Sequence, residues 1–161
     1  MNDTNVTGLR ELKEILNTLP AKIERNIMRA AMRAGAKVLQ QEIRSTISVA
    51  SGLTKGGIKI STGTKNGVVT AKVKATGKHA HIAHFLEFGT AAHVIKSKTG
   101  TVLAFGGQIY RTVDHPGITP QPVFRPALDS KDAAAVVAVG EMVKKRLTAQ
   151  GINTADIEVD E

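Results

Sequence analysis

Apolar residues recur at helical spacing in three stretches of the chain. In residues 8–19 they fall on one side of a helix, and Pro20 ends the pattern because proline breaks a helix interior. Residues 21–48 form the longest stretch, with a broad apolar arc opposite a narrower basic arc, and Gly35 would let another element approach closely. Residues 126–150 form the third stretch. The pattern predicts two N-terminal helices and one C-terminal helix.

Apolar and polar residues alternate in the middle of the chain, as in strands with one exposed face. Residues 58–60 can start a strand, and an Asn-Gly pair at residues 66–67 suits a tight hairpin turn. Residues 68–74 then alternate valine or alanine with threonine or lysine. Residues 102–113 have the pattern of a second hairpin, with a Gly-Gly pair at residues 106–107 as its turn.

Residues 80–90, AHIAHFLEFGT, are the most apolar and most aromatic stretch of the chain. Their pattern predicts a central strand that is covered on both faces. Gly89 would end this strand, because glycine takes turn conformations that aromatic residues cannot take. Glu87 is a carboxylate inside an apolar run, so it needs a basic partner or backbone amides. We expect Arg125, which lies in another apolar motif, to be the leading candidate for this partner.

These elements predict an α+β fold. We expect one twisted antiparallel sheet, made of two hairpins plus the central strand, to pack against the long N-terminal helix and the C-terminal helix. A sheet of about four or five strands is ordinary for a small domain. Residues 49–57, 90–100 and 114–122 are rich in glycine, proline or polar residues and have the composition of loops. The first two loops should become ordered on contact with neighbouring subunits or rings.

Charge is divided unevenly along the chain, whose formal net charge is +8. All 22 basic residues precede residue 152, whereas the last ten residues hold four of the 14 acids. We therefore expect an N-terminal arm with a short helix at residues 1–20, a single domain at residues 21–150 and an acidic tail at residues 151–161. Such a chain suits a polyanionic neighbour, an acidic protein or contact between tail and body, and charge alone does not choose among them.

A row of basic residues lies on the long helical pattern. Arg25, Arg29, Arg33 and Lys37 follow one another at i, i+4 spacing, so they line one side of the helix. This row can be a solvated face, a surface for DNA phosphates or an interface between subunits. A sequence-specific DNA reader is not indicated, because helix-turn-helix and zinc-finger patterns are missing and aromatic residues are scarce.

Composition and motifs exclude several classes of site. The chain has no cysteine, so it contains neither disulfides nor thiolate metal sites. His79 and His81 would share one face of the predicted strand and His84 would lie on the other, so the three cannot converge, and we expect neither a metal site nor a cofactor. The sequence contains no nucleophile elbow, phosphate loop or dinucleotide fingerprint, so no enzyme is indicated. A metal-dependent nuclease using Glu87 and the histidines stays as a rival class.

The same reasoning applies to membranes and secretion. No apolar run approaches the ~20 residues that a membrane-spanning helix needs. The first residues, MNDTNVTG, lack the layout of a signal peptide. We therefore expect a soluble protein that is made and kept in a cytoplasm-like compartment and does not contact a membrane.

Two motifs carry a resemblance to a known family. They are HFLEFGT at residues 84–90 and P-x-F-R-P-A-L at residues 122–128, and they follow a G-L-x-x-L start, an alanine-rich helix and a Gly-Leu-Thr loop. In this order they resemble the tail-completion or neck proteins of long-tailed, lambda-like bacteriophages, which include minor tail components. The resemblance covers roughly residues 8–150 and leaves out the acidic tail.

The resemblance implies a structural protein of the virion, located at the neck or tail, assembled in the host cytoplasm and without catalysis. Such proteins are expected to form a hexameric ring at the head-proximal end of the tail, between tail terminator or tail tube proteins and head-connector proteins, with DNA in the lumen. A sequence-independent nucleic-acid-binding protein outside a ring is the alternative. The resemblance gives interface or structural roles to residues of both motifs: Phe85, Glu87, Phe88, Gly89, Thr90, Phe124, Arg125 and Pro126.

Overall fold

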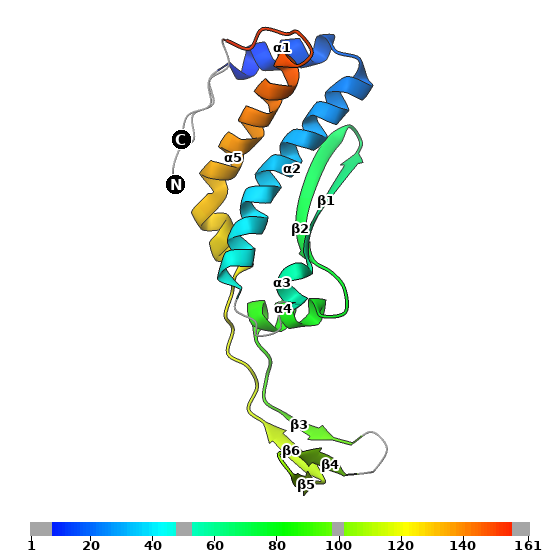
Figure 1. Cartoon of the computed structure of the whole chain (residues 1–161), viewed down its shortest axis with the longest axis vertical. Helices are drawn as coiled ribbons and strands as arrows, with labels where there is room; N and C mark the ends of the chain where they lie inside the picture. The colour runs from blue at the N-terminus through cyan, green and yellow to red at the C-terminus, as the bar shows by residue number, and fades with distance from the viewer. Residues whose placement is uncertain (1–7, 48–52, 98–101, 156–161) are drawn as a thin grey trace.

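The computed structural model describes residues 8–47, 53–97 and 102–155. The described helices are α1 (Leu9–Thr18), α2 (Ala21–Thr46), α3 (Leu53–Gly56), α4 (Ala80–Phe88) and α5 (Phe124–Thr148). The described strands are β1 (Ile58–Lys65), β2 (Val68–Ala75), β3 (His93–Lys96), β4 (Leu103–Phe105), β5 (Gln108–Tyr110) and β6 (Thr112–His115). The predicted α+β class is confirmed. Figure 1 shows an elongated molecule, with a body made of the helices and the β1–β2 hairpin, and a distal lobe made of β3 to β6.

Helices α2 and α5 lie side by side along the body, and α1 lies across one end of the pair (Figure 1). Ile27 of α2 packs with Val143 and Leu147 of α5, and apolar residues of α1 cover this cluster. Gly35 allows the close approach expected from the sequence, because a Cβ there would lie 2.7 Å from Val139 Cγ2. The three helices predicted from apolar spacing are therefore confirmed.

The β1–β2 hairpin packs one face on α2. Asn66 (φ 50°) and Gly67 (φ 81°) both occupy the left-handed region, as a primed turn requires, so the hairpin predicted from the Asn-Gly pair is confirmed. Ile58 on the inner face is fully buried. Its carbonyl oxygen accepts hydrogen bonds from Gln40 Nε2 at 2.7 Å and Arg44 Nη2 at 2.8 Å. Both apolar burial and hydrogen bonds therefore hold the hairpin to α2.

Residues 80–88 form helix α4, so the prediction of a central strand is wrong. Ala83 is buried and Leu86 packs against an apolar cluster of α2, β1 and α5, whereas Phe85 and Phe88 are exposed. The two inner residues are three positions apart, and so are the two exposed phenylalanines. This is the spacing of a helix on the surface of a core.

The error has a physical cause. A short run that is apolar throughout fits the period of a helix as well as that of a strand. The run holds one β-branched residue, Ile82, among alanine, leucine, phenylalanine and histidine, so local preference gives little support to a strand. Gly89 ends the element with φ 71°, as expected, but it ends a helix.

The described strands form three separate two-stranded sheets, so the prediction of one larger sheet is also wrong. In the distal lobe β3 pairs with β6 and β4 pairs with β5. The second hairpin is confirmed around its Gly-Gly turn, but its second strand is divided at Arg111. Strand β3 and the second half of β6 lie in stretches predicted to be loops. Strand β3 is exposed at every position, so no apolar alternation marks it, whereas Val113 and His115 of β6 are half-buried.

Some expectations fall partly or wholly on residues that the structure does not describe. The predicted loop at residues 49–57 contains α3, and its first part lies outside the described residues. The end of the loop at residues 90–100 lies outside them as well. The same holds for the start of the N-terminal arm, at residues 1–7, and for the acidic end, at residues 156–161.

Two extended segments connect the distal lobe to the body (Figure 1). Thr90 and Ile118 form an isolated bridge between them, with N–H to carbonyl distances of 3.0 and 3.1 Å. Nearer the body, the Gln121 N–H donates to the Leu86 carbonyl at 2.7 Å. Gly89 fits here because a Cβ would lie 2.5 Å from the Ile118 carbonyl oxygen. The segment that enters the lobe and the segment that leaves it are therefore held together.

Candidate interaction surfaces

Glu87 of α4 caps the start of α5. Its Oε2 accepts hydrogen bonds from the backbone N–H of Val123 at 2.7 Å and of Phe124 at 3.0 Å, and its Oε1 accepts from Arg125 N–H at 3.4 Å. These N–H groups have no partner inside the helix and lie at its positive end. Val123, the residue before the helix, supplies no side-chain cap of its own. A carboxylate from another helix therefore does the work of an N-cap residue.

The environment of Glu87 lowers the pKa of its carboxyl group. Desolvation is the largest single influence and raises the pKa. The hydrogen bonds from Phe124, Val123 and Arg125, together with the charge of Arg125, act in the opposite direction and outweigh it. Glu87 is therefore ionised at neutral pH, and its negative charge lies at the positive, N-terminal end of α5.

The expected partner of Glu87 is confirmed in part. Backbone donors meet the carboxylate, as the sequence suggested, and the leading candidate Arg125 contributes its N–H. The Arg125 guanidinium lies over the ring of Phe88, with Cζ 6.0 Å from the centroid. The two ion pairs in the described part of the chain are Arg10–Glu11 and Lys131–Glu42.

The structure brings the two sequence motifs together. Thr90 pairs with Ile118, just ahead of the second motif, and Gly89 packs on Pro120. Phe124 packs against the apolar cluster beneath α4, and Pro126 is exposed in the first turn of α5. The residues that carry the family resemblance therefore form one junction between α4, α5 and the distal lobe.

Helix α4 presents an exposed aromatic surface, which the strand prediction missed. It consists of His81, His84, Phe85 and Phe88, and Phe88 is 56 % exposed. The rings contact one another, with centroids 4.8 Å apart for His84 and Phe88. Aromatic residues and arginine are enriched in protein interfaces. Spacing of three, four and seven residues from His81 was the signal in the sequence that could have revealed this surface.

The aromatic surface is not arranged as a metal site. Within the described ranges, no group of three or more histidine, aspartate or glutamate side chains is placed to hold a metal ion. In a strand His84 would face away from His79 and His81, whereas in helix α4 His81 and His84 are both on the exposed side. His81 and His84 now lie near one another, and each contacts Phe85.

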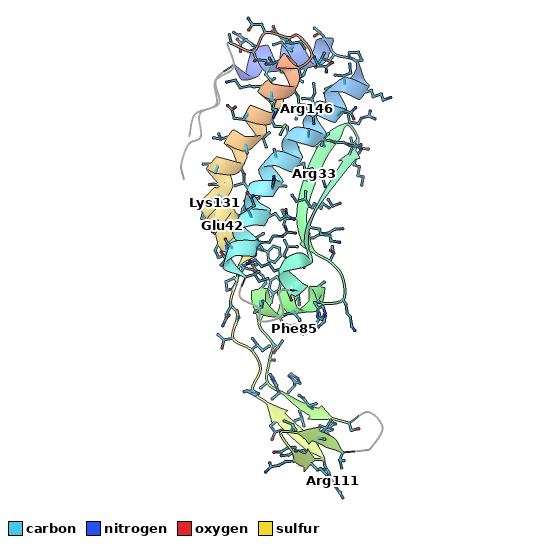
Figure 2. All side chains as sticks on the ribbon, in the orientation of Figure 1. Arg33, Glu42, Phe85, Arg111, Lys131 and Arg146 are labelled. Carbon is cyan, nitrogen blue, oxygen red and sulfur yellow. The ribbon has the colours of Figure 1, made fainter. Side chains whose placement is uncertain are left out.

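The basic row of α2 runs beside β1. Arg29 Nε donates to Thr64 Oγ1 at 3.2 Å, and Arg25 is exposed. Arg33, labelled in Figure 2, and Lys37 line a hollow of about 490 Å³ together with Lys59 of β1. The row predicted from i, i+4 spacing therefore exists, and one of its members is hydrogen-bonded to the hairpin.

The hairpin extends this basic surface. Lys59 and Lys74 lie directly opposite each other in the pairing of β1 with β2, and Lys72 is on the same outer face. Like charges at directly opposed positions destabilise a strand pair. An anion on this face would remove that repulsion. The alternation of Thr70, Lys72 and Lys74 in the sequence was the signal for this basic face of the hairpin.

An apolar groove separates β2 from α5. It has a volume of about 490 Å³. Helix α2 forms its floor, and the apolar lining includes Met32, Leu39, Val73, Leu128, Val136 and Val139. Leu128 is 52 % exposed and Val136 is 43 % exposed, so the groove is open on its α5 side. Part of the alanine and valine run at residues 133–139 of α5 therefore lines an open groove.

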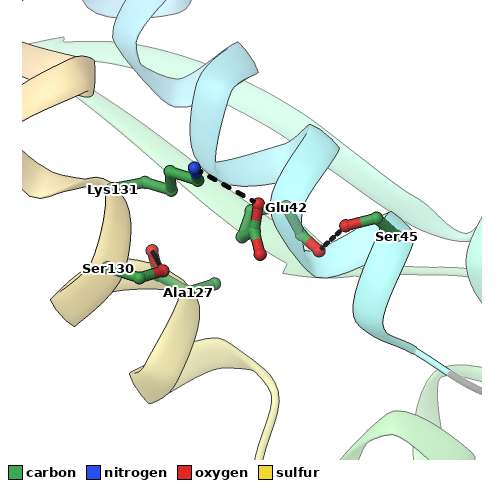
Figure 3. A network of polar contacts seen from close by, with 5 residues as sticks. All are labelled: Glu42, Ser45, Ala127, Ser130 and Lys131. Atoms are coloured by element: carbon green, nitrogen blue, oxygen red, sulfur yellow. Dashed lines mark hydrogen bonds and ion pairs between the residues drawn. The ribbon is translucent and has the colours of Figure 1, made fainter.

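An ion pair joins α5 to α2, and two serine side chains bond to carbonyl groups within their own helices. Figure 3 shows the ion pair between Lys131 Nζ and Glu42 Oε2, at 4.0 Å. Ser45 Oγ donates to the Glu42 carbonyl at 2.7 Å, and Ser130 Oγ donates to the Ala127 carbonyl at 3.4 Å. The ion pair is partly exposed and contributes little, about 0–1 kcal/mol. Apolar packing therefore sets the spacing of the two helices.

Comparison with known proteins gives one match. The model of a family described as "Bacteriophage HK97-gp10, putative tail-component" matches residues 10–89. This span runs from α1 to the end of α4 and stops where the distal lobe begins. The motif at residues 122–128 lies outside the span. No curated protein and no solved structure matches the chain. In the part that the structure describes, no helix is both long and apolar enough for a membrane span.

Proposed function

We propose that this chain, whose residues 10–89 match the HK97-gp10-like family of bacteriophage tail components, forms a hexameric ring at the head-proximal end of the tail. As a structural protein of the virion neck, it joins tail terminator or tail tube proteins to head-connector proteins and surrounds the DNA channel. One observation carries the proposal beyond the family: the single chain leaves much apolar surface uncovered. None of the described residues between 89 and 122 is buried, and α4 exposes two phenylalanines. Assembly covers surface of this kind.

The proposed role needs no catalysis. Glu87 is the carboxylate that a nuclease at this site would use. Three backbone N–H groups engage it, and its lowered pKa makes it a weak proton acceptor. Its position at the α4–α5 junction supports a structural role.

A direct test uses the purified protein and intact tails. We expect the mass in solution to be a multiple of the chain mass, and negative-stain images to show rings with a central hole. Antibodies against the chain should label the head-proximal end of isolated tails. A protein that stays monomeric, or labelling at the distal end of the tail, would contradict the proposal.

A sequence-independent DNA contact is a second candidate, which the opposed Lys59 and Lys74 favour. In a ring this contact would lie in the lumen, and outside a ring it would be a function of its own. Reversing Arg33 and Lys37 to glutamate should weaken binding of random duplex DNA and make its dependence on salt less steep. Arg146→Glu, at the far end of α5, is the matched control. Equal DNA affinity in all variants would identify the row as a solvated face or a protein interface.

A further inference from the structure

We propose that the distal lobe of one copy docks into the apolar groove of a second copy. This inference rests on the proposed function, because it names the contact between subunits of the assembly. The lobe comprises β3 to β6, and the groove is the one between β2, α2 and α5. Each is an apolar surface that the single chain leaves open.

The described residues of the distal lobe form no buried core of their own. Its two sheets have two strands each, and sheets of this size are marginally stable in water. Ile109 is 71 % exposed, Val94 is 52 % exposed and Ile95 is 37 % exposed. Among described residues, neither buried apolar cluster of the molecule includes any side chain from the lobe. The lobe therefore needs an apolar surface from elsewhere.

The groove offers such a surface. Its walls are almost entirely aliphatic, and Leu128 and Val136 stand open at its α5 side. Its volume of about 490 Å³ can take several aliphatic side chains of the size found on the lobe. Ile109 and Val94 are β-branched, like most strand residues that pack against a helix.

The lobe cannot fill the groove of its own chain. It projects away from the α4 end of the body (Figure 1), whereas the groove is lined by α2, β2 and α5 of the body. The bridge between Thr90 and Ile118 joins the two connecting segments, and the bond from Gln121 to Leu86 ties the returning segment to α4. Folding back would break the bond to α4. The partner is therefore a second copy.

The charged residues around the lobe and the groove also support docking onto a second copy. Asp132 lies between Leu128 and Val136 on one side of α5, four residues from each, and is exposed. Asp129 is exposed in the same part of α5, and in the described structure neither aspartate has an ion-pair partner. Arg111 lies at the tip of the lobe, in Figure 2 at the far end from the body, and is also exposed. A docked lobe brings this arginine to the acidic rim of the groove.

The contact has a defined symmetry. The lobe and the groove are different surfaces, so the interface is heterologous and each docked pair leaves one lobe and one groove free for further copies. Such contacts continue until they close a ring, or else they extend into a filament. A ring therefore requires no other contact between subunits than this one.

The test substitutes each surface and then mixes the products. Ile109→Asp removes the lobe side, Val136→Asp removes the groove side, and Val68→Asp is the matched control. Val68 is 64 % exposed on the β1–β2 hairpin and belongs to neither surface. We expect each of the first two variants to be monomeric by analytical ultracentrifugation, with unchanged circular dichroism. The control should assemble like the unsubstituted chain.

An equimolar mixture of Ile109→Asp and Val136→Asp should form a species of twice the chain mass, because it retains one intact lobe and one intact groove. This product also shows that both variants are folded. Three outcomes overturn the contact: both variants still assemble, the mixture stays monomeric, or the control is as defective as they are. If the unsubstituted chain is itself monomeric, the proposed function fails as well, so the two failures are distinguishable.

Discussion

The body and the distal lobe are stabilised in different ways. In the body, Ile58 and Leu147 are fully buried, and helices approach closely at Gly35. In the lobe, backbone pairing between short strands joins the elements, and apolar side chains such as Ile109 face outward. The body is therefore the part of the chain that is built to be stable alone. The other part gains its stability from what it binds.

The largest expected effect is on the body. Leu147→Ala should lower the free energy of unfolding by about 3 kcal/mol, because it leaves a cavity in the cluster of α1, α2 and α5. Urea denaturation followed by circular dichroism measures this loss. Val68→Ala, at an exposed valine outside both the lobe and the groove, should change the value by less than about 0.5 kcal/mol. Similar losses for both variants would mean that α5 does not pack as described.

Gly35→Ala tests the close approach of α2 and α5. The added methyl group would meet Val139 Cγ2 at 2.7 Å and the Ala135 carbonyl oxygen at 2.8 Å. Overpacking of this kind costs about 1–3 kcal/mol, while alanine returns about 1 kcal/mol of helix propensity. We expect a net loss of stability in the same denaturation experiment. Gly56→Ala, where a Cβ meets nothing within 4 Å, is the control. A stabilised Gly35→Ala variant would refute the tight contact.

Glu87→Gln tests the cap on α5. Loss of the charge should cost about 1 kcal/mol at neutral pH, the usual size of a capping or helix-end interaction. The pKa of Glu87 is lowered in the folded state, so its contribution is present above the ordinary carboxyl pKa of about 4.3. That contribution is lost as the pH falls through the lowered value.

The measurement is stability as a function of pH for both proteins. The difference between the unsubstituted chain and Glu87→Gln should shrink on acidification and vanish below the folded pKa of Glu87. Glu14→Gln, at an exposed glutamate of α1, should show little difference at any pH. A gap that persists unchanged in acid would show that the charge of Glu87 does not contribute.

The smallest effect on the free monomer is expected in the lobe. Ile109→Ala should change the free energy of unfolding by less than about 0.5 kcal/mol, because the side chain is already in water. Hydrogen exchange sharpens the comparison: backbone amides of β3 to β6 should exchange fast in the monomer and slowly in the assembly. Strong protection of these amides in the monomer would remove the distinction between the two regions.

Sequence patterns predicted the body well, because an element that is buried on one face has apolar residues at a regular spacing. The spacing of apolar residues located α1, α2 and α5, and the Asn-Gly pair located the β1–β2 turn. Glu87 was singled out because a carboxylate in an apolar run must find donors, and it does so at α5. In each case a requirement of packing, turn geometry or hydrogen bonding restricted the residue types at particular positions, and this restriction was visible in the sequence.

The failures have the opposite cause. Residues 80–88 are apolar on every side, so period alone could not decide between strand and helix, and the aromatic surface of α4 was missed with it. Strand β3 is exposed at every position, so alternation gave no signal there, and β6 has two half-buried positions, too few to show a period. The apolar groove depends on how three elements meet in space, and Val136 alone did not reveal it.

The paired segments at Thr90 and Ile118 make the lobe an insertion with adjacent ends. A chain in which a tight turn replaces residues 91–117 would still be able to form the α4–α5 junction, because Glu87, Gln121 and Val123 lie outside the excised part. The architecture is therefore modular. One fixed scaffold can carry lobes of different length or sequence, and exchanging the lobe alone would change which neighbour the scaffold recognises.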